Sequence, residues 1–181
     1  HTQAIANLLF QFGGMPFVDL AHLEKSNLNQ GLLKYNRMKT GTPMSVEIID
    51  SAYELLSLLR NNHSSSCSDR PDYLFHILSG EYKRGEEGAY REYQSALRKF
   101  NNHLKSLSRK LRLHSSVTSY TSCHSWATTA KYRGVPIEMI SESLGHKSIK
   151  TTQIYLKGFE LEERTKVNKQ NYYYVRRFKI A

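Results

Sequence analysis

One amphipathic stretch, from Tyr90 to Leu111, constrains the fold of this chain more than any other feature of its sequence. Its apolar side chains recur in alternating steps of three and four residues: Tyr90, Tyr93, Leu97, Phe100, Leu104, Leu107 and Leu111. That spacing places them on one face of a helix of about six turns. A two-stranded coiled coil shows the same spacing, but so short a repeat in a compact chain is more typical of a core helix. We therefore expect one long core helix and a mainly helical fold.

Shorter helices and one hairpin are expected around this stretch. The same periodicity predicts helices over residues 2–12, 17–23, 50–60, 117–133 and 136–144, and one more after Ser148. Two further segments, 31–36 and 43–48, are predicted as strands of a β-hairpin, because Gly41 lies in the turn that joins them. The expected fold class is mainly α with a small antiparallel β-hairpin or sheet. No sharp change in composition divides the chain, so we expect a single domain over residues 1–181.

The charge of the chain favours a polyanionic partner. The 26 Lys and Arg residues against 16 Asp and Glu give a formal net charge of +10, which suits DNA or RNA better than an acidic small molecule. On the long helix, basic residues lie off the apolar face, among them Arg98, Lys105 and Arg109. Such a face is often merely solvated, but this one is almost entirely positive in its second half, as expected of a surface that follows phosphates.

The cysteines and the apolar runs indicate the compartment. Cys67 and Cys123 are far apart and form no Cys-x-x-Cys pair, so neither a metal site nor a disulfide framework is predicted. No apolar run approaches the roughly 18 residues that a membrane span needs. The chain begins at His1 with neither an initiator Met nor a signal pattern. We expect a cytoplasmic protein without membrane partners, and a fragment of a longer chain.

A short turn near the C-terminal end carries the strongest chemical signal. Gly145 is expected to end one helix, Ser148 to cap the next, and Tyr155 to lie about two turns into it. An arbitrary tyrosine on a short helix is usually a core aromatic. A phenol has a pKa of about 10, so a nucleophilic tyrosine needs cations and hydrogen-bond donors nearby. His146, Lys147 and Lys150 supply groups of that kind.

The run from Tyr120 to Tyr155 resembles the active site of the tyrosine recombinase, or phage integrase, family. In that family a His-x-x-Arg box is followed by a helix, then by Leu-Gly-His, then by a nucleophilic tyrosine. Here the box reads Tyr120-Thr121-Ser122-Cys123-His124, and Leu144-Gly145-His146 precedes Tyr155. The resemblance implies the tyrosine recombinase catalytic-domain fold, with a separate N-terminal DNA-binding domain that these residues do not include.

The resemblance also implies roles for individual side chains. Tyr155 would attack a DNA phosphodiester and form a 3′-phosphotyrosyl link, while His146 would donate a hydrogen bond to a phosphate oxygen. Lys39, in the turn of the predicted hairpin, would protonate the leaving 5′-oxygen, although an edge-strand lysine also protects against aggregation. Tyr120 takes the position of the box histidine, and His124 would brace the site or serve as a core residue. No cofactor and no metal is implied, because protein cations neutralise the phosphate.

Both arginine positions of the family hold other residues here. The family uses two arginines as bidentate phosphate clamps, and these positions read Pro16 or Gly13, and Cys123. Losing one such donor commonly lowers the rate on the order of a hundredfold to a thousandfold. Strongly reduced cleavage is therefore expected, unless another arginine reaches the phosphate. Arg37, two residues before Lys39, is the better candidate for this, and Arg133 is the other.

Three functions remain open from the sequence. The first is a site-specific recombinase or integrase of a mobile element, bacterial or phage-encoded and nucleoid-associated. The second is a catalytically weakened relative that binds DNA and has a regulatory or assembly role, which Cys123 favours. The third is an unrelated helical DNA-binding regulator, because two short helices joined by a Gly-containing turn also resemble a helix-turn-helix.

The expected partner is double-stranded DNA in every case. DNA contacts are expected from Arg37, Lys147 and Lys150, and from Arg98, Lys105 and Arg109 of the long helix. Self-association on DNA is also expected, and two alternatives stay open for the aromatic tail within residues 160–181: an association patch, or a segment that folds back onto its own core. The sequence leaves open the target site, the number of protomers and whether Cys123 is native or a lesion.

Overall fold

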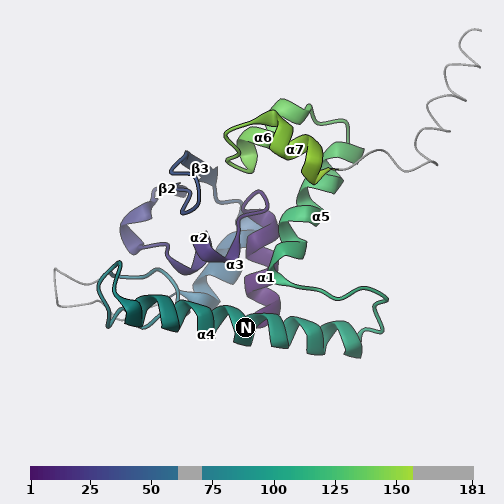
Figure 1. Cartoon of the computed structure of the whole chain (residues 1–181). Coiled ribbons are helices and arrows are strands. Elements are labelled where there is room, and N and C mark those ends of the chain that lie inside the picture. The colour runs from purple at the N-terminus through teal and green to yellow at the C-terminus, as the bar shows by residue number, and fades with distance from the viewer. Residues whose placement is uncertain (61–70, 157–181) are drawn as a thin grey trace, which may run out of the picture.

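The computed structural model describes residues 1–60 and 71–156, and its elements confirm a mainly helical fold with one small antiparallel sheet (Figure 1). The helices are α1 (Thr2–Gln11), α2 (Phe17–Ala21), α3 (Asp50–Leu59), α4 (Glu87–Lys110), α5 (Ser119–Tyr132), α6 (Ile137–Ser143) and α7 (Ile149–Tyr155). A short 3₁₀ helix, η1, spans Lys25–Asn27, and the strands are β1 (Leu28–Asn29), β2 (Leu32–Asn36) and β3 (Pro43–Glu47). Each predicted helix and strand in the described residues is present, with ends shifted by a few residues at most.

The sheet is a hairpin with a short third strand at its edge. Its strand order is β1-β2-β3, both pairs are antiparallel, and Leu33 lies opposite Val46. The turn of the hairpin closes through two backbone bonds, from Arg37 N to Thr42 O and from Gly41 N to Arg37 O, with a positive φ of 70° at Gly41. The sequence did not predict β1, because two residues are too few for an alternating pattern. The turn that projects from β2 and β3 is therefore tightly closed.

The main core gathers buried side chains of α1, α2, α3 and α4 with Leu33 of β2, in the centre of Figure 1, while α5 and α6 share a smaller second cluster. Leu8 and Leu9 of α1 are fully buried in it, and the ring of Phe17 stacks on Phe100 of α4 with centroids 4.6 Å apart. Just after α1, Gly14 lies so close to α5 that an added Cβ would be 3.2 Å from the Cα of Cys123. This close approach fixes the start of α5 against the N-terminal part of the chain.

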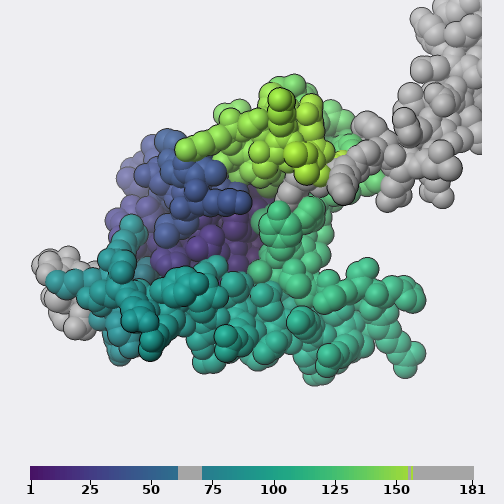
Figure 2. Space-filling view, in the orientation of Figure 1, coloured from purple at the N-terminus to yellow at the C-terminus, as the bar shows by residue number. Residues whose placement is uncertain are grey.

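The long helix is present, but the prediction of a continuous core face is wrong at both ends. Phe100 and Leu104 are buried, whereas Tyr90 is 64% and Leu111 is 65% exposed. The reason is length, since α4 has 24 residues and α1, which packs against it, has 10. At about 1.5 Å per residue, both ends of α4 extend past the core, and in Figure 2 the helix forms a band along the bottom of the molecule.

An irregular segment that the sequence did not single out completes the core. Tyr73, Leu74, Phe75 and Leu78 are buried without belonging to a helix or a regular strand. Part of this backbone pairs with the segment after α2, since Leu74 N donates to Leu23 O over 2.7 Å. The predicted polar loop over residues 61–69 and the tail over residues 160–181 lie outside the described residues.

The C-terminal helices follow the predicted turn. Gly134 ends α5 with a φ of 80°, Pro136 is the N-cap of α6, and Gly145 follows α6 with a φ of 64°. Ser148 caps α7, because its side chain accepts from Lys150 N over 3.3 Å. Tyr155 is the last of the seven residues of α7, which agrees with the predicted position about two turns into the helix. None of the helices within residues 1–60 and 71–156 is long and apolar enough to cross a membrane.

Candidate functional site

A cavity of about 320 Å³ lies where the hairpin turn meets α2, the start of α5 and the turn between α6 and α7. It brings together residues that are far apart in sequence, including most of the predicted site. Its lining comprises Pro16, Val18, Asp19, Arg37, Lys39, Thr40, Tyr120, Cys123, Leu144, His146, Lys147 and Thr151. Because four of these side chains are cations or a histidine and one is an acid, the cavity is suited to an anion.

Arg37 reaches this cavity from the first residue after β2 and is nearly buried, with 9% of its surface exposed. Its Nη1 donates to Asp19 Oδ2 over 2.8 Å, and Asp19 Oδ1 accepts from Met38 N over 2.9 Å. Burial raises the pKa of Asp19, while the Met38 amide and the Arg37 charge oppose that rise. Because both carboxylate oxygens accept, the ionised form of Asp19 fits the site and holds the guanidinium in place.

Gly145, of the Leu-Gly-His turn, lies directly against the side chain of Arg37. A Cβ at position 145 would be 2.7 Å from Arg37 Cγ, 2.9 Å from Arg37 Nε and 2.9 Å from Met44 Sδ. The φ of 64° at this residue is also one that side-chain-bearing residues rarely adopt. Glycine is therefore required here both by the backbone conformation and by the packing of the arginine.

Two threonines tie the hairpin turn to the same glycine. The hydroxyls of Thr40 and Thr42 donate to Gly145 O over 3.2 and 3.4 Å, and their own oxygens are 2.9 Å apart. Lys39 precedes this pair and is exposed at the rim of the cavity. These bonds therefore fix the hairpin turn that carries Lys39 against the turn that carries His146.

His146 is half-buried and held at two points. Its backbone N donates to Ser141 O over 3.0 Å, and its Nδ1 lies 2.9 Å from the hydroxyl oxygen of Thr152. Burial lowers the pKa of His146, and the positive charges of Arg37 and Lys39 lower it further. The ring is therefore neutral near pH 7, and as a neutral ring it can donate one hydrogen bond.

The start of α5 supplies the third wall of the site. Cys123 is buried and lines the cavity, as does Leu144. The ring of Tyr120 meets that of His124 edge to face, with centroids 4.7 Å apart and an angle of 70° between the planes. Burial raises the pKa of Tyr120, as does Cys123, and burial lowers the pKa of His124. His124 does not line the cavity, so its contact with the Tyr120 ring fits a bracing position.

Other predicted residues lie elsewhere. Arg98, Lys105 and Arg109 are exposed on α4, and Lys150 is exposed on α7. None of these lines the cavity, nor does Arg133 or Gly13, whereas Pro16 does. The backbone of Tyr155 ends α7, but its side chain lies outside the described part of the structure.

The sequence reading missed the hydrogen-bond partners that support the site. Asp19, Thr40, Thr42 and Thr152 were not predicted to hold other site residues, since each bond joins segments that no local pattern connects.

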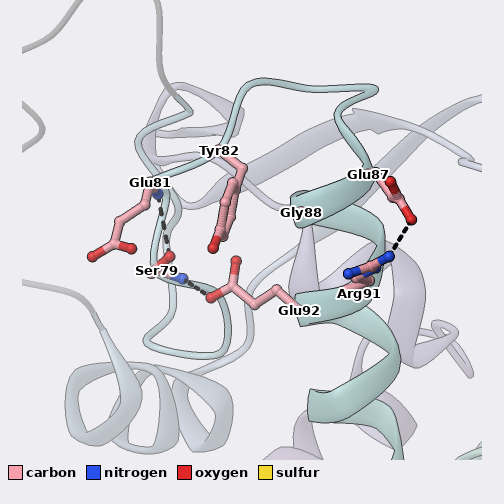
Figure 3. A pocket seen from close by; sticks show the side chains of 7 residues that line it. All are labelled: Ser79, Glu81, Tyr82, Glu87, Gly88, Arg91 and Glu92. Carbon is pink, nitrogen blue, oxygen red and sulfur yellow. Dashed lines mark hydrogen bonds and ion pairs between the residues drawn. The ribbon is translucent and has the colours of Figure 1, made fainter.

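A second hollow at the start of α4 differs in charge (Figure 3). It has a volume of about 500 Å³ and is lined by three glutamates, Glu81, Glu87 and Glu92, around the ring of Tyr82. Glu92 Oε1 accepts from Ser79 N over 2.6 Å, and Glu87 pairs with Arg91. A surface rich in carboxylates repels a phosphate backbone, so the cavity at the hairpin is the candidate site. Among the described residues, no group of three His, Cys, Asp or Glu side chains is placed to hold a metal ion.

The arrangement of the elements is that of known recombinase catalytic domains. The structure of the XerA recombinase superposes with a TM-score of 0.63 at 22% identity, over 93% of this chain and 57% of that one. The Tn1549 transposon integrase, solved with a circular intermediate DNA, gives a TM-score of 0.63 at 14% identity, over 92% of this chain and 57% of that one. The fold is therefore that of a tyrosine recombinase catalytic domain.

The sequence places the chain in the same family. Residues 2–161 match the Phage integrase family, and the chain belongs to that family of DNA-breaking and rejoining recombinases. It is 31% identical over 137 residues to the probable integrase/recombinase protein MJ0367 of Methanocaldococcus jannaschii, which covers 76% of this chain and 39% of that relative. The chain thus spans less than half of that protein's length. Membership removes the third alternative, an unrelated helical regulator.

Proposed function

We propose that this chain is the single catalytic domain of a site-specific tyrosine recombinase, acting on double-stranded DNA through a 3′-phosphotyrosyl link to Tyr155. The observation that carries the proposal is the cavity that Arg37, Lys39 and His146 line together. His146 lies in the turn that leads directly into α7, the helix that ends with Tyr155. Three donors on one anion-sized cavity are what a phosphoryl transfer without a metal requires.

The proposed reaction exchanges one phosphodiester for another. The Tyr155 oxygen bonds to the phosphorus, the bond from phosphorus to the 5′-oxygen breaks, and Lys39 gives its proton to that oxygen. His146 donates to a non-bridging oxygen as negative charge grows there. A 5′-hydroxyl of a partner strand later reverses the step, so the bond energy is conserved and no nucleotide is consumed.

Arg37 takes the role of the family's first arginine in this proposal. Arg37 lines the cavity, Asp19 holds its Nη1, and its Nε is buried against Gly145, so Nη2 and the second hydrogen of Nη1 are the donors proposed for the phosphate. The residue at the family position, Pro16, lines the same cavity, so an arginine from the hairpin enters the region that an arginine from α2 would otherwise occupy.

Cys123 supports the second candidate, a DNA-binding relative with weakened cleavage. A neutral thiol in the cavity wall supplies neither the charge nor the paired donors of an arginine. With one clamp replaced and one missing, we expect cleavage on the order of a hundredfold to a thousandfold slower than with both. The two candidates therefore differ in whether the remaining rate supports recombination.

Covalent trapping tests the proposal. The protein is incubated with nicked suicide DNA from the ends of its proposed element, and a denaturation-resistant protein–DNA band is expected. The band should disappear in Tyr155→Phe, because that change removes the nucleophilic oxygen and little else. Tyr132→Phe, an exposed tyrosine at the end of α5, is the matched control and should leave the band unchanged.

Two results would count against the enzyme. A band that persists in Tyr155→Phe would show another nucleophile. DNA binding with no band in the parent, even after long incubation, would move the assignment to the non-catalytic candidate.

The basic face of α4 gives a separate prediction about DNA affinity. Its second half presents the exposed cations Arg98, Lys105 and Arg109 without an acidic residue between them. Changing all three to glutamine should weaken binding of any DNA sequence. It should also lower the slope of log affinity against log salt by about 0.9 for each phosphate that the protein no longer neutralises. Fluorescence anisotropy over a salt series measures both quantities.

The control for that experiment lies on the same helix. Arg91→Gln removes a cation that pairs with Glu87 beside the acidic hollow, and it should leave the salt slope unchanged. An unchanged slope in the triple variant would show that this face of α4 is merely solvated.

Self-association on DNA and origin in a mobile element are also proposed; the Tn1549 transposon integrase, whose structure was solved with DNA, has the same fold.

A further inference from the structure

Thr152 is a fully buried polar residue in α7 to which the proposed reaction gives no role. Its hydroxyl oxygen lies 2.9 Å from Nδ1 of His146. Among the residues that the structure describes, the hydroxyl has no other hydrogen-bond partner, on the backbone or on a side chain. The orientation of the Thr152 hydroxyl hydrogen therefore depends on the contact with His146 Nδ1.

The contact can be made in two ways, and burial distinguishes them. If His146 Nδ1 carried a hydrogen and donated it, the hydroxyl hydrogen of Thr152 would be buried with no acceptor. Buried donors without partners are rare because the lost hydration is not replaced. If the hydroxyl donates instead, Nδ1 accepts as a lone pair and every polar atom of the contact is satisfied. A neutral imidazole whose Nδ1 accepts carries its hydrogen on Nε2.

We propose that Thr152 is a positioning residue, which fixes His146 as the Nε2–H tautomer and so makes the nitrogen opposite Thr152 a hydrogen-bond donor toward bound phosphate. The inference rests on the proposed function for its last step, since His146 is there the donor to a non-bridging oxygen. The tautomer itself rests on the 2.9 Å contact and the burial of Thr152.

Two further features of the site agree with this assignment. The ring is neutral near pH 7, because burial and the charges of Arg37 and Lys39 lower the pKa of His146, and so one tautomer must be chosen. Thr152 is also one turn before Tyr155 on α7. One helix therefore carries both the proposed nucleophile and the hydroxyl that is proposed to fix the tautomer of His146. Displacing α7 would disturb both at once.

The protein contains its own reference for the opposite tautomer. Nδ1 of His22 lies 2.8 Å from Val18 O, and a carbonyl oxygen can only accept, so a neutral His22 carries its hydrogen on Nδ1. In a long-range ¹H–¹⁵N NMR spectrum of histidine-labelled protein, His146 should show the Nε2–H pattern and His22 the Nδ1–H pattern. An Nδ1–H pattern for His146 in the parent protein would overturn the proposal without any variant.

Two substitutions then test the role of the hydroxyl. Thr152→Val keeps the shape of the side chain and removes the donor, so the His146 resonances should move toward values averaged over both tautomers. The rate of covalent trapping should fall about tenfold, as expected for one hydrogen bond. Thr152→Ser keeps the hydroxyl and should leave both the tautomer and the rate close to those of the parent. Thermal unfolding of both variants checks that neither effect comes from a loss of structure.

The outcomes separate this inference from the proposed function. An unchanged His146 pattern in Thr152→Val would overturn the claim about the tautomer. A changed pattern with an unchanged trapping rate would overturn the claim about positioning. If the parent forms no covalent band, the proposed function fails, while the NMR spectrum still decides the tautomer.

Discussion

Replacing Arg37 with lysine is expected to slow DNA cleavage about a thousandfold, because this arginine is proposed as the remaining phosphate clamp. A lysine keeps the positive charge but offers a single ammonium in place of the planar fork. It also cannot bond Asp19 and bind a phosphate with two parallel donors at the same time. The rate at which the covalent band forms on suicide DNA, under single-turnover conditions, measures the effect.

The control for this change is an arginine in an exposed ion pair outside the cavity. Arg84 pairs with Glu24 over 2.6 Å on the surface, and Arg84→Lys should leave cleavage within a few-fold of the parent. Asp19→Asn should slow cleavage in the same direction as Arg37→Lys, since it weakens the anchor of the guanidinium. Cleavage by Arg37→Lys within a few-fold of the parent would show that Arg37 is a structural partner of Asp19 and not a clamp.

Introducing an arginine at Cys123 is expected to raise the cleavage rate by about a hundredfold to a thousandfold. Cys123 lines the same cavity as Arg37, Lys39 and His146, so a longer side chain at this position is expected to extend into the space that these groups share. The new guanidinium would add two donors and a charge to the transition state. Suicide-substrate trapping with Cys123→Arg beside the parent measures the gain.

Two companion variants make that result specific. Cys123→Ser keeps a small neutral group and should give no gain. Cys123→Lys supplies charge without the planar fork and should give a smaller gain than arginine. Failure of Cys123→Arg to raise the rate, with the variant folded and bound to DNA, would show that this position no longer contributes to the reaction.

The sequence predicted the elements of this fold well where local chemistry decides them. The turn at Gly145 and the cap at Ser148 depend on neighbouring residues, and both are present as expected. The burial of Tyr90 and Leu111 was predicted wrongly, because a periodic pattern shows which face of a helix is apolar but not how long the neighbouring helices are.

The site was predicted less completely, for a physical reason. The resemblance named the side chains of the chemistry, and the cavity brings Lys39, Tyr120, Cys123 and His146 together. Their supports are long-range contacts. The bond from Arg37 to Asp19 joins an irregular turn to a short helix, and no periodicity in either segment indicates it. Such long-range contacts are visible in the folded structure and not in a single sequence.

The attachment of the hairpin threonines to Gly145 has a consequence for the protein while it is being synthesised. The hydroxyls of Thr40 and Thr42 are separated from their common acceptor by 105 and 103 residues of chain. A nascent polypeptide that has not yet emerged from the ribosome as far as Gly145 has its hairpin but no partner to hold it. It also lacks α7. In the proposed mechanism, cleavage therefore has to await synthesis of α7, which ends with Tyr155.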